Sequence, residues 1–100
     1  MRSLVIGEGM LGCALIDALA ESGHEVVGTS RDVLSDKFYL NLTKPIPELP
    51  LVDVVYICAA VTSYRKTEFN PQEAWIVNAD APIVISQQCI DRSMFPVFVS

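Results

Sequence analysis

The chain has 100 residues, of which 51% are hydrophobic, and a formal net charge of −5. This length allows one domain or part of one, and the high apolar content favours a sheet that is buried on both faces. The negative charge argues against a nucleic-acid-binding surface, which needs many Lys and Arg residues to neutralise phosphates. The longest apolar runs, such as VVYICAAV, are far shorter than the ~20 residues of a membrane span. The opening MRSLVIG does not have the pattern of a signal peptide.

Short apolar strands alternate with helical segments along the chain. Three prolines within residues 43–51 exclude a regular helix there and predict a loop across one face of the sheet. The predicted elements, in chain order, are a strand at 3–7, a helix at 10–22, strands at 25–30 and 37–42, the loop at 43–51, a strand at 53–60, a helix at 70–92 and a strand at 95–100.

Apolar residues recur at helical spacing in both predicted helices. The shared face of the first helix consists of Leu11, Leu15, Ala18 and Leu19. Gly23 suits the left-handed position that follows a helix. The shared face of the second helix consists of Trp75, Ala79, Ile83 and Ile90. We expect Trp75 to pack this helix against the sheet.

The alternation of strands and helices predicts an α/β fold with a doubly wound parallel sheet of about five strands, the Rossmann class. In the usual strand order of this class, 3-2-1-4-5-6, the last strand, VFVS, lies inside a larger sheet, and alone it would form an apolar edge that is prone to aggregate. We therefore expect residues 1–100 to be the N-terminal part of a dinucleotide-binding domain in a longer protein, with the substrate-binding half outside this chain.

A glycine-rich loop follows the first predicted strand. Gly7, Gly9 and Gly12 form a G-x-G-x-x-G pattern that opens a helix, and Met10 and Leu11 begin that helix. In such a loop the first glycine makes the turn, the second lets a pyrophosphate approach, and the third lets the helix pack on the sheet. The helix N-terminus supplies free N–H groups for the phosphate. The simpler interpretation is a tight turn between a strand and a helix.

The end of the second predicted strand bears on which dinucleotide is bound. Ser30 stands where an acidic residue would bind the ribose of NAD, and Arg31 follows it. A hydroxyl beside a guanidinium suits the 2′-phosphate of NADP, because Arg binds phosphate with a planar fork. Asp32 supports NAD as the second choice. Arg31 and Asp32 also fit an ordinary solvated loop.

The chain contains three cysteines, Cys13, Cys58 and Cys89, whose spacing does not match a set of metal ligands. An odd number of isolated cysteines is typical of reduced thiols in the cytoplasm. We therefore expect a cytoplasmic protein without a metal site.

Three stretches together resemble a known family: DVVYICAAVT, AWIVNADAPIVISQQC and PVFVS. They are similar to the extended short-chain dehydrogenase/reductases of the NAD-dependent epimerase/dehydratase type. The similarity is greatest to the dTDP-4-dehydrorhamnose reductase branch, whose members act on nucleotide sugars. The glycine loop is one residue shorter than the usual G-x-x-G-x-x-G of this family, as in divergent members, some of which have lost catalysis.

The resemblance implies further contacts with the cofactor. The residues concerned are Asn41 and Leu42 at the adenine, where the family has Asp-Leu, and Cys58, Ala59 and Ala60 along the cofactor. Thr62 follows the fourth predicted strand, at the sheet edge where ligands sit, and is expected near the nicotinamide or the substrate.

Asn78 matches the helix residue whose backbone carbonyl holds a water in the proton relay of the family. Pro82 has no N–H, so the carbonyl of Asn78 loses its usual helical partner. This predicts a kinked helix with a place for a water. A plain kink is the alternative.

The family protonates its substrate with a Tyr-x-x-x-Lys motif, because a free Tyr titrates near ~10 and needs the nearby Lys. Tyr39, Tyr56 and Tyr64 are not followed by Lys four residues later. We therefore expect no catalytic residue in this chain.

The prediction is the cofactor-binding part of an NADP-dependent reductase, epimerase or dehydratase of a nucleotide sugar, with a possible homodimer when the protein is full length. The alternative is a non-catalytic Rossmann protein that binds NADP and regulates a partner. A Tyr-x-x-x-Lys motif further along the protein would favour the enzyme.

Overall fold

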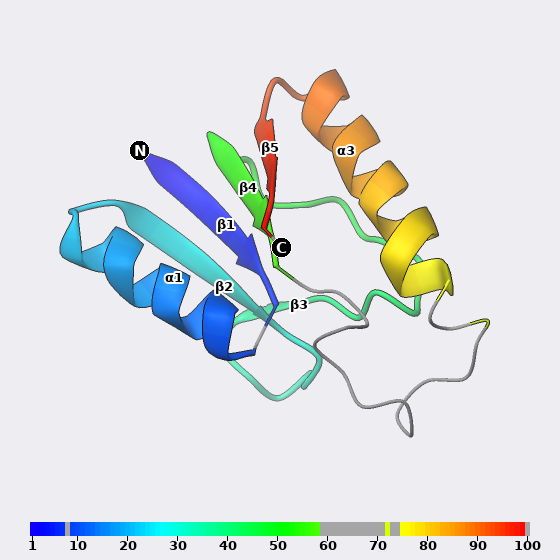
Figure 1. Cartoon of the computed structure of the whole chain (residues 1–100), viewed down its shortest axis with the longest axis horizontal. Helices are drawn as coiled ribbons and strands as arrows, with labels where there is room; N and C mark the ends of the chain where they lie inside the picture. The colour runs from blue at the N-terminus through cyan, green and yellow to red at the C-terminus, as the bar shows by residue number, and fades with distance from the viewer. Residues whose placement is uncertain (8, 59–71, 73–74, 100) are drawn as a thin grey trace.

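The fold comes from a computed structural model (Figure 1), which describes residues 1–7, 9–58, 72 and 75–99, without the side chains of 77 and 78. Its elements, in chain order, are β1 (Arg2–Ile6), α1 (Met10–Glu21), β2 (Glu25–Ser30), β3 (Phe38–Tyr39), β4 (Val54–Ile57), η2 (Ile76–Asp80), α3 (Ala81–Asp91) and β5 (Phe95–Phe98).

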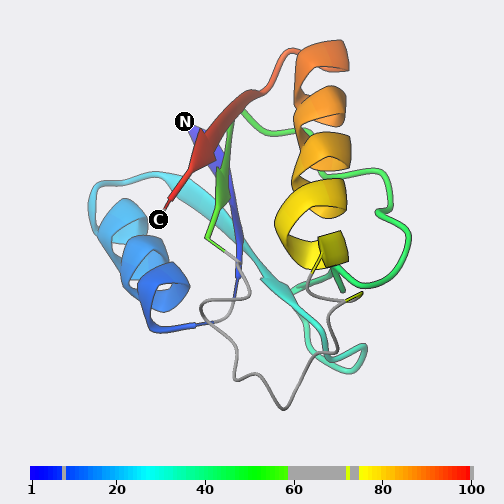
Figure 2. The same ribbon diagram turned by 45° about the vertical axis from the view of Figure 1, so that its right-hand side comes forward.

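The strands form one five-stranded sheet in the order β3-β2-β1-β4-β5. Each neighbouring pair is parallel. Figure 2 shows α1 and α3 on opposite sides of this sheet. From β1 the sheet extends to one side through β2 and β3 and to the other side through β4 and β5. The switch point therefore lies at β1, and ligands of doubly wound folds bind at such a switch point. The predicted fold class and strand order are confirmed.

The main core fills the space between the sheet and α3. Leu4, Val55 and Ile85 are fully buried in it. Burial of each such side chain contributes about 1.5–3 kcal/mol relative to exposure. The cluster consists of Leu4, Ile6, Leu40, Leu42, Leu49, Val52, Val55, Ile57, Ala81, Ile85, Cys89 and Met94.

Helix α1 lies close to the other face of the sheet because two glycines leave room. Gly12 is the buried residue of the helix, and a Cβ added at Gly28 would lie 3.2 Å from Cδ1 of Ile16. The predicted apolar face of α1 is partly wrong, since Leu11 is 48% exposed and Ala18 is also exposed. The helix is turned so that its small residue, Gly12, meets the backbone of Gly7, directly after β1. Gly23 adopts the expected left-handed conformation with φ of 84°.

The predicted apolar face of the second helix points away from the core. Trp75 is 66% exposed, so the expectation that it packs the helix against the sheet is wrong. Ile83 and Ile90 are 67% and 70% exposed. The buried face consists instead of Ala81, Ile85 and Cys89. These residues are spaced four apart, and the small Ala81 and Cys89 let the helix approach the sheet around Ile85.

The second helix begins with a π-helical turn, η2, which leads directly into α3. The N–H of Ala81 donates to the carbonyl of Ile76, five residues earlier. This wider turn comes just before Pro82, which has no N–H to donate and sits in the first turn of α3. The change of helix type therefore lies where the sequence predicts a disturbance.

The predicted proline loop is confirmed as an irregular crossover between β3 and β4 on the α3 side. Gln88 holds it twice, because its Oε1 accepts from the N–H of Leu49 (2.9 Å) and its Nε2 donates to the carbonyl of Pro47 (2.8 Å). Arg92 donates to the carbonyl of Leu49 (2.5 Å). Strand β3 is shorter than the predicted 37–42, because the chain leaves the sheet after Tyr39 to enter this crossover.

Strand β5 is the outer strand on one side of the described sheet. The N–H groups of Phe95 and Val99 donate to Asp53 and Ile57 on the β4 side. Because successive residues alternate, Pro96 lies on the outward side of the ladder, where its missing N–H removes one exposed donor. Phe95 and Phe98 are 66% and 59% exposed. No helix in the described ranges is long and apolar enough to cross a membrane.

Candidate functional site

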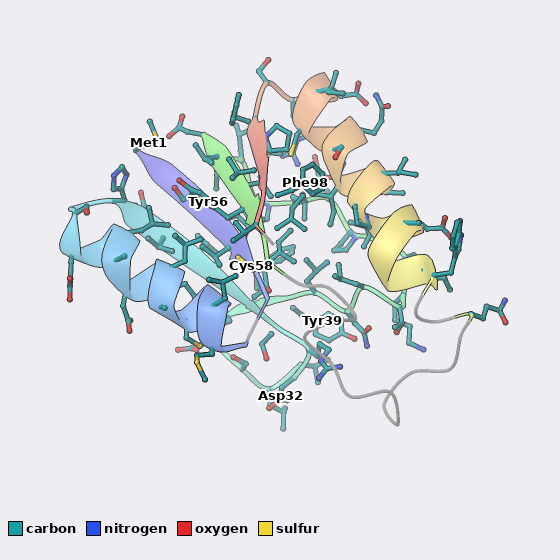
Figure 3. The ribbon with its side chains drawn as sticks, viewed as in Figure 1. Met1, Asp32, Tyr39, Tyr56, Cys58 and Phe98 are labelled. Carbon is teal, nitrogen blue, oxygen red and sulfur yellow. The ribbon has the colours of Figure 1, made fainter. Side chains whose placement is uncertain are left out.

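The carboxyl ends of the strands bring the predicted site residues to one edge of the sheet. Gly7 follows β1, Ser30 ends β2 and Cys58 follows β4. Figure 3 shows Asp32, Tyr39 and Cys58 near this edge, far from Met1 at the opposite end of the sheet. Ligands of doubly wound sheets bind at the carboxyl edge.

The glycine loop leaves an open approach to the N-terminus of α1. Gly9 is the N-cap residue in an extended conformation (φ −70°, ψ −178°), and a Cβ added to it would have no heavy atom of the described residues within 4 Å. Gly9 has no side chain that could cap the first-turn N–H groups. Met10 and Leu11 are 91% and 48% exposed. Free N–H groups at the positive end of a helix dipole, beside a residue without Cβ, suit a phosphate.

Gly7 is fixed between the end of β2 and the helix. Its N–H donates to Oγ1 of Thr29 (3.2 Å). On its other side, a Cβ at Gly12 would overlap the Gly7 carbonyl oxygen and lie 3.1 Å from the carbonyl carbon. Gly7 itself has φ of 129°, which L side chains rarely adopt. The first and third glycines therefore shape the loop, and the second leaves space above it among the described residues.

The tip of β2 forms a tight turn. Ser30 is 3% exposed, and its hydroxyl oxygen accepts from the N–H of Asp32 (3.0 Å). Oδ1 of Asp32 accepts from the N–H of Leu34 (2.9 Å). Arg31 is exposed between them. Ser30 and Asp32 thus shape the tight turn that carries the exposed Arg31.

Asn41 and Leu42 lie at the start of the crossover loop. Oδ1 of Asn41 accepts from the N–H of Thr43 (3.0 Å) and from its hydroxyl (2.7 Å). Because a backbone N–H can only donate, these contacts fix which atom of the amide is the oxygen. The free NH₂ of Asn41 can only donate, unlike the carboxylate that the family has at this position. Leu42 is 6% exposed and packs in the core.

A groove of about 270 Å³ lies beside Leu42, between the crossover loop and the second helix. Its lining is mainly apolar, with Lys44 and Asp80 as the charged members. The lining residues are Leu42, Thr43, Lys44, Pro45, Ile46, Ile76, Asp80, Ala81 and Val84. The groove is therefore continuous with the position predicted for the adenine.

Cys58 is 7% exposed at the end of β4, and its N–H donates to the carbonyl of Ile6 (2.9 Å). Burial raises the pKa of the Cys58 thiol, so the thiol stays protonated and apolar at neutral pH. The predicted residues Ala59, Ala60 and Thr62 lie outside the described part of the chain. The backbone of Asn78 lies in η2, and its role in a proton relay stays a prediction.

Two features of the site were missed by the sequence reasoning. The groove arises only when the crossover loop meets the second helix, so no single segment indicates it. Thr29 gave a weak signal, a hydroxyl residue at the end of an apolar strand, but its contact with Gly7 depends on the pairing of β1 with β2. Across the described ranges, no cluster of three or more His, Cys, Asp or Glu could hold a metal ion.

The parallel sheet, its reversal at β1 and the glycine loop place the chain in the Rossmann class of doubly wound folds. All of residues 1–100 match the family model described as the RmlD substrate binding domain, and the chain belongs to this family, in the dTDP-4-dehydrorhamnose reductase branch of the short-chain dehydrogenase/reductases.

One curated relative is a probable low-salt glycan biosynthesis reductase from Haloferax volcanii. The two sequences are 34% identical over 104 aligned residues, which cover 94% of this chain and 35% of the relative. The chain thus spans about a third of the length of this relative.

Proposed function

We propose that the chain is the dinucleotide-binding part of an NADP-dependent reductase that acts on a nucleotide sugar. The observation that carries the proposal is the open space at Gly9 above the N-terminus of α1. The family match and the name of the relative, a probable glycan biosynthesis reductase, support the reductase class.

The residues fit such a cofactor at three places. The pyrophosphate would lie over Gly9 and the first-turn N–H groups of Met10 and Leu11. The ribose of the adenosine half would lie at the tip of β2, beside Arg31, and the adenine would lie against Leu42 at the groove. When bound, the nicotinamide dinucleotide supplies the hydride for reduction.

The choice between NADP and NAD depends on the turn after β2. Arg31 offers a charge-assisted contact to a 2′-phosphate, which is worth about 1.5–3 kcal/mol when well formed. The Asp32 carboxylate opposes the phosphate charge. We therefore expect Arg31→Ala to weaken NADPH binding more than NADH binding. Asp32→Asn keeps the oxygen that accepts from Leu34 and removes the charge, so it should favour NADPH.

Calorimetric titration of the protein that carries this chain, with NADPH and NADH in parallel, tests the proposal. Tighter binding of NADPH by the parent, lost in Arg31→Ala, is the expected result. Equal or tighter binding of NADH by the parent would show that the choice of NADP is wrong. Binding of neither dinucleotide would remove the proposed function itself.

The reduction step needs a proton donor, and none of the three Tyr residues of this chain is followed by Lys four residues later. We propose that a Tyr-x-x-x-Lys pair and the sugar-binding part lie elsewhere in the full-length protein, which acts in the cytoplasm and forms a homodimer. The test is NADPH oxidation with a nucleotide 4-keto-sugar, by the full-length protein and by residues 1–100. Turnover by residues 1–100 alone would contradict this assignment.

A further inference from the structure

Gly7, the first residue of the glycine loop, is held from two sides by groups that come from different elements. Thr29, at the end of β2, accepts the Gly7 N–H through its Oγ1 at 3.2 Å. Gly12, in the first turn of α1, packs against the Gly7 carbonyl so closely that a Cβ would overlap it. Thr29 therefore orients the peptide unit before Gly7, and Gly12 limits the position of the peptide unit after it.

The burial of Thr29 makes its hydroxyl a hard acceptor to replace for the Gly7 N–H. Thr29 is 3% exposed, and Gly7 is half-buried, so water has little access to replace the contact. The other residues of β2 that pair with β1 use their backbone groups for the ladder, which ends at Gly28 opposite Val5. Beyond Gly28, the hydrogen bond from the Gly7 N–H to the Thr29 side chain joins β2 to the residue that follows β1.

We propose that Thr29 is a positioning residue that holds the glycine loop in the conformation that receives the pyrophosphate. This inference rests on the proposed dinucleotide function. Thr29 does not itself touch the phosphate; it acts through the Gly7 peptide. From Gly7 the chain runs to Gly9, whose open face is the place of closest approach.

The physical reason is that Gly7 has wide conformational freedom. A glycine can adopt many φ values at little cost, so its present φ of 129° is selected by its neighbours. Without the hydroxyl, the Gly7 N–H loses its acceptor and the peptide turns to find water. Only a fraction of the molecules then holds the binding conformation. The apparent Kd for the nucleotide equals the intrinsic Kd divided by that fraction, so it rises.

Two substitutions separate positioning from packing. Thr29→Val keeps the branched shape and removes the acceptor, whereas Thr29→Ser keeps the acceptor and removes a buried methyl group. We expect Thr29→Val to weaken NADPH and ADP binding by about tenfold or more, the result of a binding conformation populated one time in ten. Thr29→Ser should bind within about twofold of the parent, although its melting temperature falls because of the lost methyl group.

Ser22→Ala is the matched control, because it removes an exposed hydroxyl at the far end of α1, where Ser22 contacts the Ala18 carbonyl. It should leave both affinities unchanged. Calorimetry with NADPH and with ADP gives the affinities, and a thermal melt without nucleotide gives the stability of each variant.

Amide hydrogen exchange at Gly7, measured without nucleotide, provides a readout that does not need the cofactor. The Gly7 N–H should be protected in the parent and in Thr29→Ser, and should exchange faster in Thr29→Val. Rapid exchange at Gly7 in the parent would overturn the inference even if Thr29→Val fails to fold.

The binding results distinguish the two proposals. If the parent binds NADPH and Thr29→Val binds it equally well, the positioning role is wrong and the proposed function stands. If affinity follows the melting temperature, with Thr29→Ser as weak as Thr29→Val, Thr29 only packs and the inference fails. If the parent binds neither nucleotide, the proposed function and the role of Thr29 in it both fail.

Discussion

Gly9 and Gly12 belong to the same loop but should respond oppositely to the same added methyl group. At Gly9 the backbone is extended, which any residue adopts, and within the described part of the chain a Cβ meets no heavy atom within 4 Å. Replacement by Ala restricts the unfolded chain, which stabilises by about 0.4–1 kcal/mol. The loss of a favoured N-cap residue opposes this by a similar amount. We therefore expect Gly9→Ala to change the free energy of unfolding by less than about 1 kcal/mol.

Gly12→Ala should destabilise the fold, because its Cβ would overlap the carbonyl oxygen of Gly7 and the backbone would have to shift. Overpacking of this kind costs about 1–3 kcal/mol, and the better helix propensity of Ala returns about 1 kcal/mol. A net loss of about 1 kcal/mol lowers the melting temperature of a domain of this size by roughly 4–8 °C.

Gly9→Ala should weaken dinucleotide binding more than it changes the stability of the free protein. The added methyl group occupies the space that a phosphate needs, and a loss of about 1.4 kcal/mol corresponds to tenfold weaker binding. The assay combines a thermal melt of the free protein with calorimetric titration of NADPH. We expect Gly9→Ala to melt like the parent and to bind at least about tenfold more weakly. If Gly9→Ala binds like the parent, or if Gly12→Ala melts like the parent, the reasoning about this loop is refuted.

Other consequences of the structure can be measured without a ligand. Ile85 is buried and Ile83 is 67% exposed. In urea titrations, Ile85→Ala should therefore lower the free energy of unfolding by about 2–5 kcal/mol, and Ile83→Ala should lower it by less than about 0.5 kcal/mol. Equal effects would contradict the assignment of the buried face. Iodoacetamide should modify the exposed Cys13 in the native protein and the buried Cys58 and Cys89 only after unfolding. Burial raises the pKa of both buried thiols above that of an exposed thiol, so the unfolded state loses these protons first and stability should fall as the pH rises through the range where an exposed thiol titrates. Stability that rises with pH in this range would contradict that sign.

The sequence predicted the strands and the glycine loop because their signals are local. Buried strands are short apolar runs, and the loop is a fixed spacing of glycines between a strand and a helix. Strand β2 lies at 25–30, as predicted, and the loop opens α1 as predicted.

The faces of the helices were predicted less well. The second helix carries apolar residues on more than one side, and its period does not show which side meets the sheet. The large Trp75 and Ile83 suggested one face, yet the sheet is approached through the small Ala81 and Cys89. Which face of the second helix is buried depends on the distance between the helix and the sheet, and this distance is set only in the assembled fold. The role of Thr29 depends on strand pairing in the same way.

The crossover loop also sets the order in which the site can form as the chain leaves the ribosome. The β1–α1–β2 unit is made of neighbouring segments, so the half that would hold the pyrophosphate can fold early. The loop after Leu42 has to wait, because its hydrogen bonds reach Gln88 and Arg92, 39 to 43 residues further along. Closing such a long loop is slow relative to local structure. The adenine side should therefore become protected from proteases only once α3 has been synthesised and docked, and the two halves of one binding site should mature at different times.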